Sequence, residues 1–352
     1  RLVYAMAWFF VAPAIPKILE SYGLSPRFTG LVPVAFFLAT GAMQVPSALI
    51  SSKIGAKRAY IAGLAVMGLS EVSLGFSDSL PQILASYFVT GIGASLFFSS
   101  AGGLLAELNP GRESRAMGLY NAFFSIGGTF GYLWGLLEGV VGFGTASVLL
   151  GLVTMTTATI NAFAAYPNPR GVVPKATDMR DITVVSLATS GVWGAYYLVA
   201  EAFPSFVYFS YGVSTYTSSA VATALTLSSA VGGFLASKIR AYDPKSVTTY
   251  SVLGVIPALG VYVSQAWLPS LLLMGVLNEL AISGIYSLTL KLSGRGSGVL
   301  ALAVVNSGNI LGGIALVALT YFSLYYSFLL AVVISVAEVL IGYHLLRKRE
   351  EA

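Results

Sequence analysis

The sequence predicts an all-α membrane protein in which twelve transmembrane helices form two pseudo-symmetric bundles of six. Of its 352 residues, 56% are apolar and 9% are charged, whereas a soluble domain carries about a quarter charged residues. Apolar runs of about 20 residues, long enough to cross a hydrocarbon core as helices, follow one another along the chain. Two short patterns also recur at one fixed offset. A lipid bilayer is therefore the expected surrounding of this protein.

Twelve apolar runs fill nearly the whole chain and leave no room for a soluble domain. The chain begins at Arg1 without an initiator Met, so we expect a short N-terminal piece to precede it. The expected units are an N-terminal bundle over 1–166, a cytoplasmic linker over 167–182 and a C-terminal bundle over 183–352. The runs cover residues 3–21, 28–50, 59–77, 81–105, 116–138, 143–166, 183–209, 215–236, 247–266, 270–290, 297–319 and 324–346.

The two recurring patterns share an offset of 185 residues. They are Ser52-Lys53-Ile54 with Ser237-Lys238-Ile239, and Asn121 followed by Gly127-Gly128 with Asn306 followed by Gly312-Gly313. Two separate matches at one offset are hard to obtain by chance in an apolar chain. The chain is therefore interpreted as two halves of one repeated design.

Some runs carry features beyond their length. Pro13 and Pro16 in the first run, and Pro204 in the seventh, open the backbone hydrogen-bond ladder, which membrane helices tolerate where neighbours satisfy the freed groups. The second run carries a polar line at helical spacing, made of Thr40, Gln44, Ser47 and Ser51.

Lysine and arginine gather in alternate loops, and this bias sets the orientation. With the N-terminus inside, only Lys17 and Arg27 fall toward the outside. We therefore expect a multi-pass protein of the plasma membrane with both termini cytoplasmic. The net charge of +5 is then a topogenic signal, and no nucleic-acid partner is expected. The inner cations are Lys53, Lys57, Arg58, Arg112, Arg115, Arg170, Lys175, Arg180, Lys238, Arg240, Lys245, Lys291, Arg295 and the tail 347–349.

The loop after the second run resembles the signature loop of the major facilitator superfamily, Gly-x-x-x-Asp-Arg/Lys-x-Gly-Arg-Arg/Lys. Gly55 and the basic end match, while Ser52 stands where the family has Asp, and Gly233 with Lys238 matches the same frame in the second half. The loop from Glu107 to Gly118 resembles the family's helix 4–5 loop.

The resemblance covers nearly the whole chain and implies a secondary transporter that works by alternating access. It also implies an inner gate made of Ser52, Lys53, Arg58, Glu107, Arg112, Arg115, Ser237 and Lys238.

The fifth run resembles the family's antiporter motif in its glycine spacing, although Tyr132 stands where that motif has Pro. Glycines four apart lie on one helix face and let another helix approach closely. We expect Gly127, Gly131 and Gly135 to pack against a helix of the other half, with an antiporter role as the alternative. In the fourth run Tyr87 replaces the Arg of proton-linked members, so coupling must use other groups.

Ionisable residues inside a membrane are costly, so each is a functional candidate. Glu279 is the deepest, and it shares a helical face with Asn278, Ser283 and Tyr286. In the family's fold helices 1, 4, 7 and 10 surround the cavity, so the resemblance points Glu279 inward, where it would couple transport to protons. The alternative is a hydrogen-bonded packing carboxyl.

Two further ionisable residues are coupling candidates at an outer gate. Glu201 and Lys17 lie in the outer parts of the seventh and first runs, and opposite charges attract strongly in a low dielectric. Lys17 pairing locally with Glu20 is the alternative. Glu71, Glu138 and Glu338 lie nearer helix ends, where we expect packing or snorkelling.

The expected cavity is aromatic, contains one or two acids and has no Lys or Arg at mid-depth. Carriers of phosphate esters or nitrate would want a buried Arg, so the cavity better suits a lipophilic or cationic solute. We predict a proton-coupled exporter of such compounds; a neutral-solute symporter or uniporter and a non-transporting membrane sensor are the alternatives. Expected lining residues are Gln44, Tyr87, Asn121, Trp193, Tyr197, Asn278, Asn306 and Asn309, with Trp8.

The sequence excludes several other chemistries. There is no Cys, and the single His is His344 at the end of the last run, so neither thiol chemistry nor a histidine triad or metal site is expected. The phosphate-binding pattern Gly-x-x-x-x-Gly-Lys-Ser/Thr is absent from the sequence. We therefore expect a monomer that binds no cofactor or metal and is not an enzyme.

Overall fold

The computed structural model describes residues 1–165, 167–169, 179–239, 242–293 and 297–350. Most of the predicted linker lies outside the described residues, as do four predicted inner cations, Arg170, Lys175, Arg240 and Arg295. Helices make up nearly all of the described chain. They are α1 (Leu2–Phe9), α2 (Ile15–Ser21), α3 (Leu31–Ile54), α4 (Ala56–Gly75), α5 (Leu80–Glu107), α6 (Glu113–Val141), α7 (Phe143–Phe163), α8 (Met179–Ala188), α9 (Ser190–Tyr211), α10 (Thr215–Ala236), α11 (Pro244–Val255), α12 (Trp267–Ser293), α13 (Gly298–Ala318) and α14 (Ser327–Glu350). Short 3-10 helices are η1 (Pro26–Gly30), η3 (Ile256–Tyr262), η4 (Ser264–Ala266) and η5 (Leu319–Tyr321).

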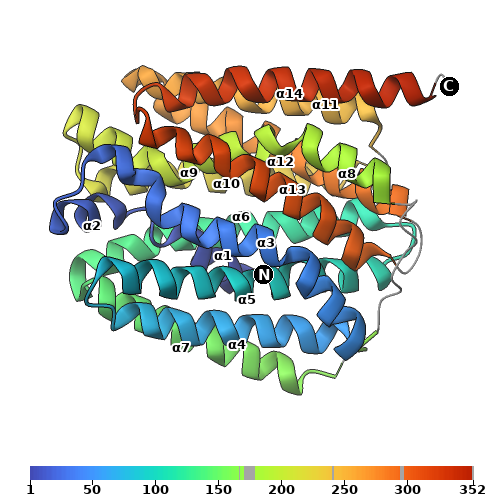
Figure 1. Cartoon of the computed structure of the whole chain (residues 1–352), viewed down its shortest axis with the longest axis horizontal. Helices are drawn as coiled ribbons and strands as arrows, with labels where there is room; N and C mark the ends of the chain where they lie inside the picture. The colour runs from blue at the N-terminus through green and yellow to red at the C-terminus, as the bar shows by residue number, and fades with distance from the viewer. Residues whose placement is uncertain (166, 170–178, 240–241, 294–296, 351–352) are drawn as a thin grey trace.

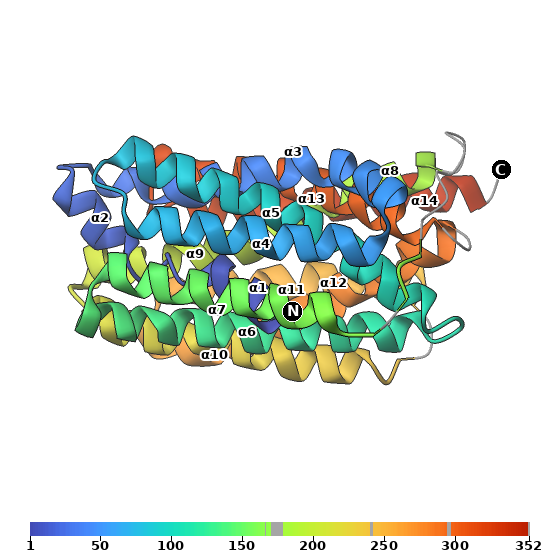
Figure 2. The same ribbon diagram turned by 90° about the horizontal axis from the view of Figure 1, so that it is seen from below.

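The helices lie side by side along the long axis of the molecule (Figure 1). α11 and α14 run along one edge and α4 and α7 along the opposite edge, with the other long helices between them; Figure 2 shows the bundle from below. The loops that join α3 to α4 and α5 to α6 lie at the same end as the C-terminus. We call this the C-terminal end, and the opposite end, where α2 lies, the α2 end.

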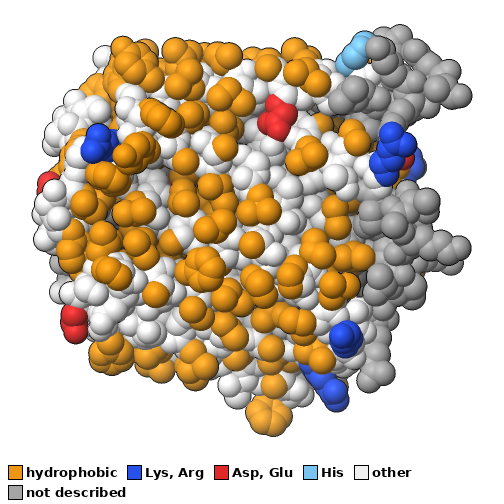
Figure 3. All heavy atoms as spheres, in the orientation of Figure 1, with side chains coloured by type: hydrophobic (Ala, Val, Ile, Leu, Met, Phe, Trp, Pro, Cys, Tyr) orange, Lys and Arg blue, Asp and Glu red, His pale blue; other side chains and the backbone are white. Residues whose placement is uncertain are grey.

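The surface between these ends is apolar. Figure 3 shows hydrophobic side chains over most of one face, with Lys and Arg near its ends. Large apolar side chains in the middle of helices, such as Leu152, Leu227 and Val333, are more than half exposed. Lipid tails solvate such a surface, and the helices satisfy their own backbone groups there.

Each of the twelve predicted runs falls on one helix or on one interrupted series of helices. By length and composition, seven helices of the described residues can cross a membrane, or eight if the bent pair α8 and α9 counts as one span. The all-helical membrane fold agrees with the prediction. The count of twelve spans is not reached by this measure, in part because breaks divide the first, seventh and ninth runs into shorter helices.

The first run is broken at residues 10–14, where Pro13 lacks a backbone donor. The N–H groups of residues 12, 14 and 15 bond within the turn at 2.9–3.3 Å. The freed carbonyl oxygens of Ala7 and Trp8 accept hydrogen bonds from the Tyr87 hydroxyl at 3.0 and 3.2 Å. Pro204 also lacks a backbone donor, but it lies inside the uninterrupted α9, so the helix continues through this opening.

The seventh run is broken at Thr189, where α8 and α9 meet at 40°. Side chains of α13 and α14 hold this break. Glu338 of α14 accepts hydrogen bonds from the Gly191 N–H, at 2.7 Å, and from the Ser190 hydroxyl. Asn309 of α13 accepts one from the Thr189 hydroxyl at 2.9 Å. The first N–H groups of a helix have no partner within it, and Glu338 supplies one.

The two repeated glycine pairs bring helices into backbone contact. A Cβ at Gly127 would lie 2.2 Å from the carbonyl oxygen of Leu2, and one at Gly313 would lie 2.9 Å from the Cα of Gly194. α6 therefore packs on α1, and α13 packs on α9. The repeat found in the sequence thus produces the same pairing in both predicted halves.

The predicted partner of the α6 glycines is wrong. Gly131 lies against the backbone of Met6, and Gly135 lies against Pro13, so this face of α6 packs on the first run and not on the other half. The glycines are four residues apart and form one line along α6, and the first run lies along that line, at Leu2, Met6 and Pro13. Other residues of α6 contact the other predicted half, among them Gly118, where a Cβ would lie 2.4 Å from the backbone nitrogen of Ser237.

Candidate functional site

Six helices from both predicted halves enclose a pocket. Its free volume is about 20 Å³, which is room for about one water molecule. An organic solute therefore cannot enter while the helices keep this arrangement. The lining residues are Arg1, Tyr4 and Trp8 at α1, Phe98 of α5, Asn121 and Phe124 of α6, Trp193, Tyr196 and Tyr197 of α9, Glu279, Ile282 and Tyr286 of α12, and Asn306 of α13.

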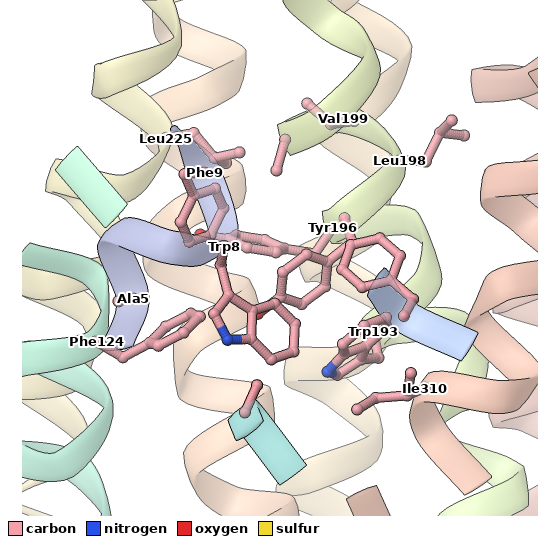
Figure 4. Packing of buried hydrophobic residues seen from close by; sticks show 14 of the residues in the cluster. Ala5, Trp8, Phe9, Phe124, Trp193, Tyr196, Leu198, Val199, Leu225 and Ile310 are labelled. Atoms are coloured by element: carbon pink, nitrogen blue, oxygen red, sulfur yellow. The ribbon is translucent and has the colours of Figure 1, made fainter. Parts of the chain in front are cut away.

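Aromatic rings from α1 and α9 form most of one wall. Trp193 and Tyr197 are four residues apart on α9 and stack with ring centroids 3.9 Å apart. Trp8 lies 5.2 Å from Tyr197 and 6.0 Å from Trp193, and Figure 4 shows Trp8 and Trp193 side by side between their helices. Such a wall favours a flat or apolar ligand body.

Glu279 is the acidic group of the pocket and is 5% exposed. Ser125 of α6 donates to its Oε2, and Ser283 of α12 donates to its Oε1, each at 3.3 Å. Asn121 in turn donates to Ser283 at 3.1 Å. The inward orientation predicted for Glu279 is therefore present, and α6 of the predicted N-terminal half reaches it directly.

Arg1 brings a cation into the pocket that sequence analysis did not foresee. The central carbon of its guanidinium lies 3.9 Å from the ring centroid of Tyr120, 4.5 Å from those of Tyr4 and Phe124, and 5.1 Å from that of Phe98. The expectation of no Lys or Arg at mid-depth is wrong. The residue precedes the first apolar run, but its spacing to Tyr4 and Trp8 places all three on one helical face, and this was the missed signal.

The remaining predicted lining residues divide into two groups. Asn121, Trp193, Tyr197 and Asn306, with Trp8, line the pocket. Gln44, Tyr87, Asn278 and Asn309 bond elsewhere: Ser99 donates to Gln44 at 2.7 Å, Asn278 donates to the Val192 carbonyl at 3.3 Å, and Tyr87 and Asn309 hold the two helix breaks. A polar residue in a membrane helix can serve a neighbouring helix as well as a cavity, and its sequence position does not distinguish the two.

The predicted Lys17–Glu201 pair is absent. Glu201 is 1% exposed and neither of its carboxylate oxygens has a hydrogen-bond partner in the protein, whereas Lys17 is exposed beside Glu138 in a separate pocket at the α2 end. α2 meets α9 through Glu20 and Tyr208, and Lys17 faces the pocket that contains Glu138 instead.

Other groups join the two predicted halves at the α2 end. The Tyr208 hydroxyl donates to Glu20 at 2.7 Å, so Glu20 engages α9. The Gly30 N–H donates to the Thr320 hydroxyl at 3.2 Å.

The loop between α3 and α4 binds within its own half. Asn168 fills the space beside Gly55, whose φ of +93° favours glycine, and the Ala56 N–H donates to the Pro169 carbonyl at 2.9 Å. Lys57 donates to the Ala164 carbonyl. This loop is therefore attached to the segment after α7.

The predicted inner-gate residues lie at the C-terminal end. The hydroxyls of Ser52 and Ser237 each donate to a carbonyl of their own helix, at 2.8 and 2.7 Å, because Ser lacks the reach and charge of the family's Asp. Glu107 is partly exposed at the end of α5, and the exposed cations are Lys53, Arg58, Arg112, Arg115 and Lys238. Contact between the halves here is made by Gly118 with Ser237, and by Gly103, where a Cβ would lie 2.2 Å from Val299.

Glu338 is a second residue whose place the sequence did not reveal. It was expected to pack or snorkel, yet it caps the start of α9, two residues before Trp193. Its role could have been found only by knowing that α14 packs beside the break between α8 and α9. Within the described ranges, no group of three or more His, Cys, Asp or Glu side chains lies together as a metal site would require.

Comparison with known proteins gives three findings. The sequence model of the Major Facilitator Superfamily matches residues 1–315. Multidrug efflux protein YfmO of Bacillus subtilis is 33% identical over 125 residues, which cover 36% of this chain and 32% of that protein. The probable sulfoacetate transporter SauU of Cupriavidus necator is 29% identical over 161 residues, 45% of this chain and 37% of that protein. The match thus spans about a third of the length of these relatives.

A solved structure has the same fold. The crystal structure of the human organic anion transporter MFSD10 (TETRAN) superimposes with a TM-score of 0.77 over 98% of this chain and 96% of that chain, at 14% sequence identity. At this identity the likeness concerns the fold alone.

Proposed function

Because the chain belongs to the major facilitator superfamily, and is thus a membrane transporter and not an enzyme, we propose that it is a secondary active transporter whose substrate site is the pocket around Glu279. The observation that carries this proposal is the pocket itself, lined from both predicted halves and closed to about 20 Å³. A site of that kind suits alternating access, in which the halves part first at one end and then at the other.

Two sets of contacts between the halves support this cycle. At the α2 end they are Glu20 with Tyr208 and Gly30 with Thr320. At the C-terminal end they are the backbone approaches at Gly103 and Gly118. Breaking one set while keeping the other would open the pocket to one side of the membrane.

We assign proton coupling to Glu279. A gradient does work only if the protonation of a group differs between the two open states, and Glu279 is the acidic residue that lines the pocket. Glu201 and Lys17 take no part in this proposal, because they neither pair nor line the pocket.

Reconstitution tests this assignment. Glu279→Gln should abolish proton-driven accumulation of a transported solute in proteoliposomes while counterflow exchange continues, because the neutral amide mimics one protonation state. The control is Glu71→Gln, which replaces a buried carboxyl bound to Thr154 at 2.7 Å, outside the pocket. Accumulation by Glu279→Gln with the wild-type pH profile would overturn the proposal.

The direction of coupling depends on the charge of the solute. If solute and proton exclude each other at Glu279, an inward proton gradient drives export, as expected from the sequence; the name of the multidrug efflux relative supports this form. If they bind together, the same gradient drives uptake. The name of the probable sulfoacetate transporter supports a solute that carries negative charge.

We also propose that the C-terminal end faces the cytoplasm of a cell bounded by the plasma membrane. The exposed cations gathered at that end support this orientation. Since the chain has no Cys, a single Cys at exposed Asp78 or at exposed Arg112 reports one end each. Impermeant maleimide should label Asp78→Cys in intact cells and Arg112→Cys only after lysis; the reverse pattern would contradict the orientation.

A further inference from the structure

The pocket contains a set of hydrogen-bond donors with no partner in the protein. They are Nε and Nη1 of Arg1, Nε1 of Trp8 and Nδ2 of Asn306, all buried and all belonging to lining residues. More than nine in ten buried polar groups in proteins are paired, and an unpaired one destabilises the folded protein. Four unpaired donors on one small pocket are therefore a feature that a ligand would explain.

The rings around Arg1 strengthen this point. Four aromatic rings within 5.1 Å enclose the guanidinium, and the Tyr4 hydroxyl approaches both Arg1 and the Trp8 indole without reaching hydrogen-bond geometry. Rings attract the cation but accept none of its N–H groups in the plane of the guanidinium. The fork of donors stays open, and that fork matches the two oxygens of a carboxylate or sulfonate.

The carboxylate and amide acceptors of the pocket are already engaged, whereas the Tyr4 hydroxyl has no partner. Glu279 receives Ser125 and Ser283, and the Oδ1 of Asn306 receives the Tyr286 hydroxyl at 3.0 Å. Neither Nε nor Nη1 of Arg1 bonds to Glu279. Four of the five unpaired polar atoms of the pocket are thus N–H donors, and Arg1 adds positive charge.

We propose that the solute is an organic anion whose carboxylate or sulfonate binds Arg1, Trp8 and Asn306, with an aromatic or apolar body against Trp193 and Tyr197. This inference rests on the proposed function, because it takes the pocket to be the transport site. It names the class of solute and the residues that select it.

The position of Glu279 then fixes the coupling. An anion held by Arg1 shares the pocket with this carboxyl, and two negative charges in a low dielectric repel. The anion therefore binds together with a proton on Glu279, and by linkage each increases the affinity for the other. The other titratable side chains near Glu279 are Arg1 of α1, Tyr196 of α9, Tyr286 of α12 and Tyr242, and Arg and Tyr do not ordinarily titrate between about pH 5 and 8.

Three probes with one aromatic body test the inference: 2-naphthoate, 2-naphthalenemethanol and 2-naphthylmethylamine. Their binding to the purified full chain is measured by calorimetry at pH 5.5 and pH 7.5. We expect the anion to bind at least about tenfold more tightly than the other two, because a charge-assisted hydrogen bond contributes about 1.5–3 kcal/mol. We also expect tighter binding of the anion at pH 5.5.

Two variants and a matched control identify the residues. Arg1→Gln should weaken 2-naphthoate binding about tenfold to a hundredfold, and Glu279→Gln should remove its pH dependence. Arg27→Gln is the control, since Arg27 also lies on aromatic rings, Phe28 at 5.1 Å and Tyr321 at 5.3 Å, but outside the pocket. Circular dichroism spectra and unfolding temperatures establish that each variant is folded.

The outcomes separate this inference from the proposed function. Equal or tighter binding of the alcohol or the amine, no binding of any probe, or an Arg1→Gln variant that binds as wild type would each overturn the anion inference. The transporter proposal would still stand if a different solute were accumulated in a Glu279-dependent way. If Glu279→Gln still accumulated solute in proteoliposomes with the wild-type pH profile, the proposed function would be overturned even if the anion binds.

Discussion

The first and seventh runs correspond in the repeat and each is broken, but the two breaks lie at different positions and are held in different ways. The break between α1 and α2 is dictated by Pro13, and turn hydrogen bonds within it satisfy most of its backbone. The break between α8 and α9 has no proline, and side chains from α13 and α14 hold it at Thr189, Ser190 and Gly191.

This difference indicates which wall of the pocket moves. Pro13 fixes its own φ and lacks an N–H, so the break beside Trp8 persists when its neighbours change. A break held by tertiary hydrogen bonds can change when those bonds change. We therefore expect α9, with Trp193 and Tyr197, to be the wall that rearranges when the pocket opens.

The largest effect should come from substituting the glycines at which α6 packs on α1 and α13 packs on α9. Gly127→Leu and Gly313→Leu place side chains against backbone 2.2 and 2.9 Å from the Cβ position, and overpacking costs about 1–3 kcal/mol or more. Both variants should unfold at clearly lower temperature in detergent. Gly139→Ala, with nothing within 4 Å, is the control; wild-type stability of either leucine variant would contradict the close packing.

The next largest effect should fall on the α8–α9 break alone. Glu338→Ala leaves the Gly191 N–H and the Ser190 hydroxyl without their acceptor, at a cost of about 2 kcal/mol. Hydrogen exchange should speed up at residues 190–194 and stay unchanged at residues 10–15. Glu71→Ala, which removes a comparable carboxyl–hydroxyl bond in α4 and α7, should leave both segments protected. Equal exposure of both breaks in Glu338→Ala would refute the comparison.

Removing the side-chain hydrogen bonds at the break between α1 and α2 should have a weaker effect. Tyr87→Phe removes the hydroxyl that bonds the carbonyls of Ala7 and Trp8, and a neutral hydrogen bond contributes about 1 kcal/mol. Exchange should increase modestly at residues 10–15 only. Tyr216→Phe, at a largely exposed tyrosine, serves as control. Opening of α9 in Tyr87→Phe would mean that the two breaks are not independent.

The smallest effect should fall on the start of α11, outside the membrane. Its cap, Asp243, is the reference against which the cost of removing the Glu338 cap of α9 is compared. Asp243 caps α11 by accepting the Ser246 N–H at 2.6 Å, and this bond lowers the pKa of Asp243 below its ordinary value. The stabilisation is thus present above the ordinary pKa and is lost as the pH falls through the lowered one. Asp243→Ala should cost about 1 kcal/mol at pH 7, and the difference from wild type in chemical unfolding should shrink toward pH 3. An undiminished difference at pH 3 would assign the effect to something other than the charged cap.

Composition and periodicity were sufficient for the membrane fold and for singling out Glu279 as a carboxyl deep in an apolar run. Its inward orientation followed from the resemblance to the family, since another buried carboxyl, Glu201, does not line the pocket. The repeat also anticipated that Asn121 and Asn306 would occupy corresponding positions, and both line the pocket. The sequence could not distinguish Gln44 or Asn309 from cavity residues, since their partners come from other helices. Arg1 was missed because it lies before the first run, and Glu338 because no proline marks the break that it holds.

The central claim is that the two halves move around the pocket under control of Glu279. Spin-label pairs test it most directly, with Cys at Asp78 and Gln265 across the α2 end, and at Arg112 and Lys245 across the C-terminal end; all four positions are exposed. Between pH 7.5 and 5.5 the two distances should change in opposite directions in the otherwise wild-type chain, and Glu279→Gln should abolish the change. Distances that move together, stay fixed, or still respond to pH in Glu279→Gln would contradict the account.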